Sequence, residues 1–228
     1  MWRLYRPGIR IPNGHSENPV YYYWMPDRPT RPALQERYDR RRSEMVYAAA
    51  KVFADRGYDQ TTMQDLASSM GLATGAVYHY FGSKEQLLIN ICDQLMEPLL
   101  EHAREIMVGD DQPRDKLRAL VRLWVANVVQ YRNHMLVFQQ ERHAIESGAQ
   151  WRGVRDSRKA FERLVEHALE EAKATGPPAL DKRLALVALL GMVNHTAQWY
   201  QPRGRFRPDE IADGYLSLLL PPAYPNRR

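Results

Sequence analysis

The stretch TTMQDLASSMGLATGAVYHYFGSK, residues 61–84, decides the fold because it contains two very short helical patterns separated by a glycine. Thr62 can cap a first helix of about two turns, with Asp65 at the third position, and Gly71 ends it. A second helix starts near Thr74, whose hydroxyl can cap it. Helices this short are unstable alone and must pack on longer neighbours. Two of them joined by a short turn with glycine predict a helix-turn-helix.

The second helix of such a unit enters the major groove of DNA with its N-terminal residues near the base edges. Small residues at 73–76 would let the backbone approach the groove, and Val77 and Phe81, four apart, form the inner face. The rings between them present donors outward, and Lys84 supplies a cation at the start of the next helix. Any pair of short helices with an intervening glycine would show the same caps, so this pattern alone favours DNA binding without establishing it.

Helical periodicity continues on both sides of the stretch. Upstream, an amphipathic pattern predicts a helix at 38–56, and Gly57 stops it. Downstream, helices are expected at 84–107, 113–130, 132–146, 150–174, 180–200 and 208–220. Strand alternation and internal repeats are absent from the sequence. The sequence therefore predicts an all-α protein with about nine helices.

Composition narrows the class of protein. The 228 residues, 44% of them hydrophobic, suffice for one large domain or for a small domain joined to a larger one. No run of about 18 apolar residues predicts a membrane span, and the first residues carry charges and prolines where a signal peptide needs an apolar core. Cys92 is the single cysteine and has apolar neighbours, which favours a buried thiol in a cytoplasmic protein.

The positive charge is concentrated at the N-terminus. Residues 1–42 hold nine arginines against four acids, which accounts for the whole net charge of +5. Such a segment favours polyanions. Residues 1–33 show no helical or alternating period, so we expect a mostly irregular basic and aromatic leader. A solvated, disordered leader explains residues 1–30 equally well.

An enzyme is the alternative class, and the sequence argues against it. It lacks the H-E-x-x-H and G-x-S-x-G motifs and the glycines of a phosphate-binding loop. The five histidines from His102 onward have no paired spacing typical of a metal site. We therefore expect no catalytic residues, no metal and no cofactor.

Residues 44–90 resemble the DNA-binding domain of the TetR/AcrR family of bacterial transcriptional regulators. The resemblance rests on AAAKVFADRGYDQTTMQDLASSMGLATGAVYHYFGSKEQLL, residues 48–88, with its F-x-x-x-G-Y, G-x-hydrophobic-Y-x-x-F and S-K-E-x-L elements in family order. It implies a homodimeric regulator of double-stranded operator DNA with a divergent C-terminal effector-binding half. The expected organisation is a leader at 1–33, a three-helix DNA-binding domain at 34–85, and an effector-binding and dimerisation domain at 86–228.

The resemblance assigns DNA contacts position by position. Thr62 matches a phosphate-contacting residue at the start of the second helix, and Tyr78 matches the phosphate-contacting tyrosine of the family. Lys84 matches a lysine that holds phosphate beside a helix N-terminus, and His79 and Tyr80 match variable contacts to bases or backbone. The positions nearest the base edges are Ala73, Thr74, Gly75 and Ala76.

One departure from the family pattern concerns base recognition. Residues 73–76 include no Arg, Lys, Asn or Gln, the usual bidentate readers of bases. Specificity then rests on Thr74, on apolar contact with thymine methyls, or on DNA shape. Residues 43–85 carry only three basic side chains against five acidic ones. We therefore expect Arg40, Arg41 and Arg42 to supply phosphate or minor-groove charge.

In this family the C-terminal half forms a pocket whose occupation changes the spacing of the two DNA-binding units. Candidate effector-binding residues combine rings and polar groups on apolar helices. They are Trp124, Asn127, Tyr131, His134, Phe138, Gln139, Arg142, Asn194, Gln198 and Trp199. The alternative for each is a satisfied polar group in the core or at an interface.

HTAQWYQPRGRF, residues 195–206, is similar to the end of the eighth helix in a branch of the family that regulates fatty-acid and steroid-side-chain breakdown. The effectors of that branch are CoA thioesters, so the resemblance implies an acyl-CoA ligand, with Arg142, Arg203 and Arg205 available for its phosphates. A neutral hydrophobic ligand is the main rival. A ligand-released repressor that binds a palindromic operator is the favoured function, and an activator of the same fold is the alternative.

Overall fold

The computed structural model describes residues 31–174 and 181–220, and no strand occurs within these ranges. The prediction of an all-α fold is confirmed. The leader at 1–33 lies almost wholly outside the described residues. The elements are α1 (Pro32–Arg56), α2 (Met63–Ser69), α3 (Thr74–Phe81), α4 (Lys84–Val108), α5 (Pro113–Gln130), α6 (Arg132–Gln140), α7 (Arg142–Ser147), η2 (Ala149–Trp151), α8 (Arg152–Ala174), α9 (Lys182–Trp199) and α10 (Pro208–Leu219).

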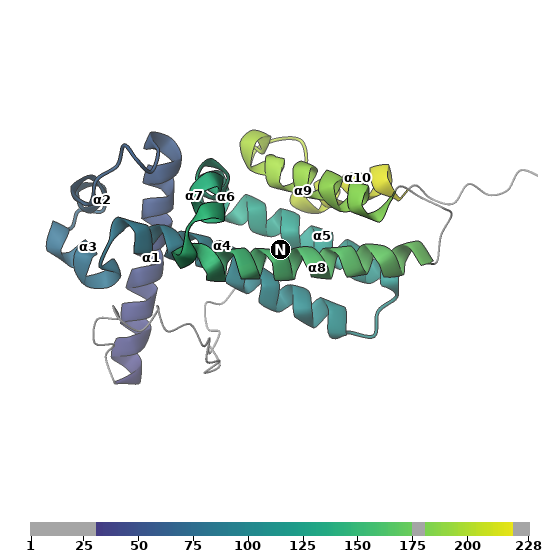
Figure 1. The fold of residues 1–228 in the computed structure, drawn as a ribbon, viewed down its shortest axis with the longest axis horizontal. Coiled ribbons are helices and arrows are strands. Elements are labelled where there is room, and N and C mark those ends of the chain that lie inside the picture. Colours follow the sequence, from purple (N-terminus) through teal and green to yellow (C-terminus); the bar gives the residue numbers. More distant parts are fainter. Residues whose placement is uncertain (1–30, 175–180, 221–228) are drawn as a thin grey trace, which may run out of the picture.

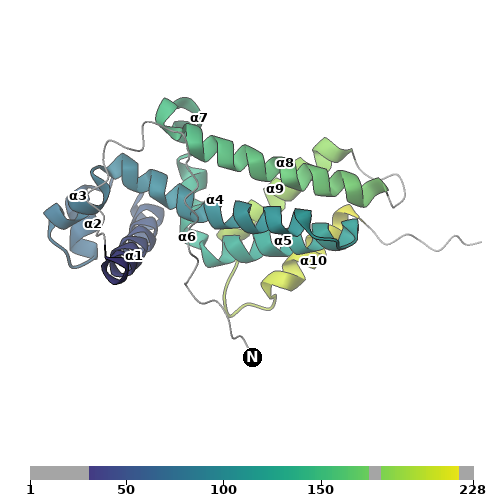
Figure 2. The ribbon, with the colours of Figure 1, turned by 90° about the horizontal axis from the view of Figure 1, so that it is seen from below.

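The helices form a small unit at one end of the molecule and a longer bundle behind it (Figure 1). Helices α1 to α3 make the small unit, and α1 stands across the long axis of the molecule (Figures 1 and 2). Helix α4 runs from this unit into the bundle, where it packs on α5 and α8. Helices α9 and α10 pack on α5 on the other side of the bundle.

The predicted helix-turn-helix forms with most of its expected caps. The Thr62 hydroxyl accepts a hydrogen bond from the Asp65 amide (3.1 Å), and the Asp65 carboxylate accepts one from the Thr62 amide (2.9 Å). Gly71 follows α2 with a φ of 64°, a left-handed conformation that glycine adopts without strain. The prediction that the Thr74 hydroxyl caps α3 is wrong, because α3 begins at Thr74 itself and Ala73 precedes it without a side-chain cap.

Most helix boundaries lie within two residues of those predicted, and two expected helices differ by more. Helix α1 begins at Pro32 rather than at residue 38, since proline is well suited to the first position of a helix. The stretch 132–146 forms α6 and α7 instead of one helix, because the backbone leaves the helical conformation at Glu141 (φ −92°, ψ 14°). The described residues therefore contain ten α-helices rather than nine.

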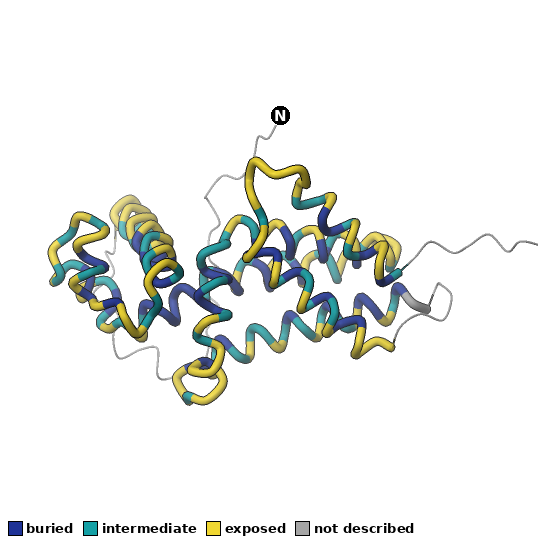
Figure 3. Tube along the Cα trace, turned by 90° about the horizontal axis from the view of Figure 1, so that it is seen from above, coloured by how far each residue is buried: buried dark blue, intermediate teal, exposed yellow. Residues whose placement is uncertain are grey.

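One hydrophobic core joins the small unit to the bundle. Val77 and Phe81 of α3 are buried as predicted, together with Phe53 of α1 and Leu87 of α4. Buried positions follow the inward faces of the long helices along the molecule (Figure 3). Helix α4 also runs without a break through the predicted domain boundary at 85/86, so that boundary stays a prediction.

Two remaining expectations concern burial and membranes. Cys92 is buried as expected, and burial raises the pKa of its thiol far above the usual value, so the group stays protonated. Among the described helices, none combines the length and the apolar character that crossing a membrane would require.

Candidate DNA-binding surface and effector half

Helix α3 lies at the end of the molecule farthest from the bundle (Figure 1). Tyr78 is 46% exposed, although its ring is large and apolar. Ala73, Gly75 and His79 are also exposed, while Thr74, Ala76 and Tyr80 are half-buried. Because Val77 and Phe81 anchor the opposite side in the core, the start of α3 is presented to solvent as a groove-entering helix requires.

Thr62 is exposed, but its hydroxyl is already used inside the protein. It accepts from the Asp65 amide and donates to the Asp65 carboxylate at 2.6 Å. The hydrogen bonds that the Thr62 hydroxyl and the Thr62 amide donate to the Asp65 carboxylate are the main causes that lower the pKa of Asp65. The contact of Thr62 with phosphate stays a prediction, and it would have to replace or share the bond to Asp65.

Lys84 has a structural role that the sequence did not reveal. Its ammonium donates hydrogen bonds to the carbonyls of Tyr58 (2.9 Å) and Thr61 (3.0 Å). It also lies 4.3 Å from the centroid of the Tyr58 ring, a cation–π arrangement. Burial, helped by neighbouring carboxylates, raises the pKa of Tyr58 to about 12, so the ring stays neutral beneath the cation. Lys84 therefore fastens the start of α4 to the loop between α1 and α2, and its contact with phosphate stays a prediction.

The three arginines expected to contact DNA differ in where their side chains lie. Arg40 and Arg41 are exposed on α1, and Arg41 lies 3.4 Å from Glu44. Arg42 turns inward: it donates a hydrogen bond to the Asn90 side chain and lies 5.6 Å from the centroid of the Phe81 ring. The exposed Arg37 was not singled out from the sequence. Its spacing of three and four residues from Arg40 and Arg41 was the signal that could have identified it.

The effector candidates on α5 lie in the core. Trp124 is 2% exposed and packs edge-on against Phe161 of α8, with ring centroids 5.0 Å apart. Asn127 is buried and donates to the Leu95 carbonyl of α4 at 3.1 Å. Phe138 of α6 is buried as well. These contacts account for the three side chains as packing groups, and their contact with a ligand stays a prediction.

A polar group joins α6 to α9. The Gln139 amide donates to the Asn194 backbone carbonyl (2.8 Å), and the Gln198 amide donates to the Gln139 side-chain carbonyl (3.0 Å). The side-chain oxygen of Asn194 is buried and finds no hydrogen-bond partner among the described residues. A buried acceptor left in this state is costly unless a donor reaches it, and a ligand donor would supply the missing hydrogen bond.

The remaining effector candidates are scattered. Tyr131 lies at the break between α5 and α6, where its ring is 5.2 Å from that of His134. Arg142 is exposed at the start of α7, and Trp199 is 42% exposed at the end of α9. Of the effector candidates, the structure therefore joins Gln139, Asn194 and Gln198 by hydrogen bonds, and it leaves Arg142 and Trp199 exposed at helix ends.

His134 connects the bundle to the small unit. It is fully buried, and its Nε2 lies 2.9 Å from the Gln94 side-chain oxygen. Gln94 in turn donates to the Ser43 hydroxyl of α1 at 2.6 Å. Burial lowers the pKa of His134 to about 4, so the ring is neutral at ordinary pH. Three helices, α1, α4 and α6, are thus joined by one chain of polar contacts.

Helices α9 and α10 present an apolar outer surface. Leu184 and Val187 of α9 are 53% and 51% exposed, and the exposed Gly191 continues the same face one turn later. Leu218 of α10 is 74% exposed. Apolar side chains at helical spacing on an outer face are typical of protein interfaces.

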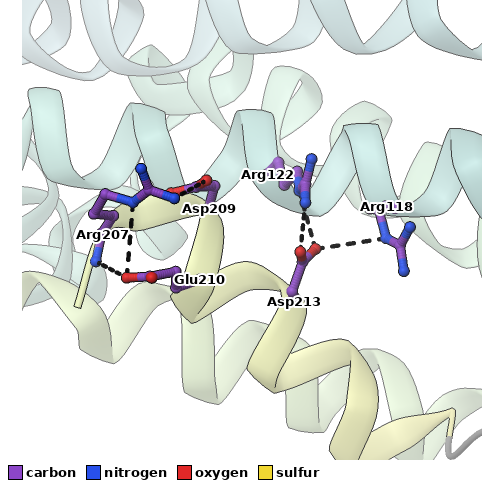
Figure 4. A network of polar contacts seen from close by, with 6 residues as sticks. All are labelled: Arg118, Arg122, Arg207, Asp209, Glu210 and Asp213. Carbon is purple, nitrogen blue, oxygen red and sulfur yellow. Dashed lines mark hydrogen bonds and ion pairs between the residues drawn. The ribbon is translucent and has the colours of Figure 1, made fainter.

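Ion pairs hold α10 in place on α5 (Figure 4). Asp213 accepts a hydrogen bond from Arg122 Nε at 2.9 Å and lies 3.5 Å from Arg118 Nε. At the start of α10, the Glu210 carboxylate accepts from the Arg207 amide at 2.8 Å. The Asp213 pairs are exposed and contribute little stability each, but they are the contacts here that join α10 to α5 and so help to fix which face of α10 points outward.

Comparison with known proteins identifies the family. Residues 46–91 match the family described as bacterial regulatory proteins, tetR family, and residues 110–221 match the tetracyclin repressor-like C-terminal domain. The chain belongs to the TetR family. It is therefore a transcription regulator and not an enzyme, and the resemblance read from residues 44–90 is confirmed.

Relatives and solved structures cover most of the chain. The HTH-type transcriptional repressor KstR2 of Mycolicibacterium smegmatis is 28% identical over 197 residues, which span 86% of this chain and 93% of the relative. The TetR-family regulator PfmR of Thermus thermophilus is 28% identical, with a TM-score of 0.68 over 77% of this chain and 96% of its own. AibR in complex with isovaleryl coenzyme A and operator DNA is 28% identical, with a TM-score of 0.69 over 80% of this chain and 99% of its own.

Proposed function

We propose that the chain is a homodimeric repressor that binds a palindromic operator in the cytoplasm and releases it when a small effector binds. The exposed start of α3 carries the proposal, because a short helix anchored on one side and open on the other is suited to the major groove. The repressor name of the KstR2 relative supports the direction of regulation.

The apolar face of α9 and α10 supports a dimer. Leu184, Val187 and Gly191 would pack against the same residues of a second copy, since a two-fold interface is self-complementary. The face lies on the bundle, away from α3 (Figure 1). Two copies joined there would present two recognition helices, and two-fold symmetry then requires a palindromic site.

The DNA contacts divide into base-reading and backbone contacts. Residues 73–76 would face the bases, with Thr74 as the polar member, and Tyr78 would donate to phosphate. The exposed arginines Arg37, Arg40 and Arg41 lie along one flank of α1. They would neutralise backbone phosphates and supply the positive charge that α2 and α3 lack.

The effector proposed is an elongated acyl-CoA thioester. The AibR neighbour binds isovaleryl coenzyme A, which supports this class of ligand. The buried acceptor of Asn194 could receive a donor from the ligand, and Arg203 and Arg205 in the exposed loop after α9 could meet its phosphates. Binding must favour the dimer shape that no longer fits the groove spacing, because only differential affinity releases DNA.

A panel of short-chain, long-chain and steroid acyl-CoA esters tests this proposal by thermal shift and by release of bound promoter DNA. At least one ester should raise the melting temperature and release the DNA. Arg203→Ala combined with Arg205→Ala should weaken that response, whereas Arg104→Ala, an exposed arginine on α4, should not. If an uncharged hydrophobic compound released the promoter DNA while every ester was inactive, the proposal of a thioester effector would be refuted.

A further inference from the structure

Helix α1 contacts the recognition helix through a pair of stacked rings. The ring of Tyr38 lies on that of Tyr80, with centroids 4.8 Å apart and planes 25° apart. Both residues are half-buried, Tyr38 in the second turn of α1 and Tyr80 in the last turn of α3. The first turns of α1 extend well past α2 and α3 (Figure 1), so the stack ties an otherwise projecting segment to the helix that meets DNA.

A second contact lies one turn further along α1. Arg42, four residues after Tyr38 and so on the same face of the helix, places its guanidinium 5.6 Å from the centroid of the Phe81 ring. It also donates a hydrogen bond to Asn90, whose own amide donates to the Gln86 carbonyl at 2.5 Å. Two consecutive residues of α3 are thus held by two residues of α1.

The recognition helix needs such support. It has only eight residues, and a helix of this length has no independent stability. Gly82, with a φ of 71°, follows it directly, so its C-terminal end joins α4 through a conformation that glycine adopts without strain. The core side chains Val77 and Phe81 fix its depth, and the contacts at Tyr80 and Phe81 oppose rotation about its axis.

We propose that Tyr38, Arg42 and Tyr80 are positioning residues that set the angle of the recognition helix and do not themselves contact DNA. The inference rests on the proposed DNA binding through α3. Because the ring of Tyr80 is stacked on Tyr38, its contribution comes from the ring face and not from the hydroxyl. Because the guanidinium of Arg42 is bound to Asn90, this arginine differs in role from the outward Arg40 and Arg41.

Equilibrium binding to a fragment of the protein's own promoter tests the proposal. Tyr38→Phe and Tyr80→Phe keep both rings, so each should bind within about twofold of the wild type. Tyr38→Ala and Tyr80→Ala should each lose about tenfold or more. The double alanine variant should bind the promoter no more weakly than the single alanine variant with the lower affinity, because either change alone already breaks the same contact. Circular dichroism and melting curves would confirm that every variant is folded at the assay temperature.

Hydrogen–deuterium exchange without DNA supplies a measurement that does not depend on operator binding. Amides of residues 74–82 should exchange faster in Tyr38→Ala than in the wild type, and at the wild-type rate in Tyr38→Phe. Tyr80→Phe binding as weakly as Tyr80→Ala would show that the hydroxyl contacts DNA and would overturn the proposal. The proposal would also be overturned if the affinity losses of the two single alanine variants added up in the double variant, or if amide exchange of residues 74–82 were unchanged in Tyr38→Ala. A wild-type protein without promoter binding would instead refute the proposed function.

Discussion

The ring of Tyr47 in α1 lies against the ring of His134 in α6, with their centroids 5.3 Å apart. The Tyr47 hydroxyl also reaches the Gln130 carbonyl at the end of α5 at 3.4 Å. The first helix of the DNA-binding unit is therefore in direct contact with the part of the bundle that carries the polar group of Gln139, Asn194 and Gln198. We expect an effector that shifts α6 to act on α1 through this contact.

His134 should make the fold sensitive to acid. Its pKa is about 4 in the folded protein and about 6.5 when unfolded, so below about pH 6.5 the unfolded chain binds the extra proton. Above about pH 6.5 the ring is neutral in both the folded and the unfolded chain, so it leaves the free energy of unfolding unchanged. Below that pH the free energy of unfolding decreases as the pH falls toward 4. The limiting loss from this group is about 1.4 kcal/mol per pH unit. Urea unfolding at about pH 7.5, 6 and 5 measures it.

The control for this titration separates His134 from the other histidines. His134→Gln should be less stable at neutral pH, but its free energy of unfolding should fall less steeply on acidification. His143→Gln, at an exposed position on α7, should keep the wild-type slope. An identical pH dependence in wild type and His134→Gln would show that this ring does not set the acid response.

Tyr78→Phe should weaken promoter binding while leaving the fold intact. The ring stays and one hydrogen bond to a charged phosphate is lost, which costs about 1.5–3 kcal/mol. Tyr200→Phe removes the hydroxyl of a half-buried tyrosine at the end of α9, on the bundle, and serves as the control in the same anisotropy titration. Equal affinity of Tyr78→Phe and wild type would remove Tyr78 from the DNA contacts.

Lys84→Met should destabilise the DNA-binding unit even without DNA. Two backbone carbonyls lose a charged donor, and the expected loss is about 2 kcal/mol. Lys51→Met, on an exposed position of α1, should leave the free energy of unfolding within about 0.5 kcal/mol of the wild type. If Lys84→Met unfolds like the wild type and only its salt dependence of DNA binding changes, Lys84 is a phosphate contact rather than a structural tie.

Val187→Glu combined with Leu184→Glu should separate the dimer. Two carboxylates per chain would face their symmetry mates in an apolar interface, where burying them unpaired is costly. Sedimentation should show monomers at micromolar concentration and a loss of promoter affinity. Val108→Glu adds a charge at a position that is 84% exposed at the end of α4, and it should leave the dimer unchanged. A dimeric double variant would place the interface elsewhere.

The short helices were predictable from sequence because their signals are local. The Thr62–Asp65 caps, Gly71 and the spacing of Val77 and Phe81 each reflect interactions within a few residues, and all appear in the structure. The split of 132–146 into two helices was missed because residues on both sides of Glu141 continue the helical pattern.

Contacts between residues far apart in the chain could not be predicted from such local signals. Lys84 bonds to carbonyls more than 20 residues away, and Arg42 reaches Asn90 in another helix. A sequence shows that these side chains are cationic, but only the packing of α1, α3 and α4 shows that their charges are used inside the protein. The sequence left open whether Trp124 and Asn127 face a ligand or the core, because an apolar helix gives no indication of which neighbour each face contacts.

We propose that the chain recognises specific DNA through α3 as a homodimer. The most direct measurement is the affinity of the purified protein for its own promoter fragment and for a scrambled fragment of equal length, at about 50 mM and 200 mM salt. We predict tighter binding to the promoter at both concentrations, two chains per site, and an affinity for both fragments that falls steeply with salt. Equal affinity for the two fragments, or one chain per site, would contradict it.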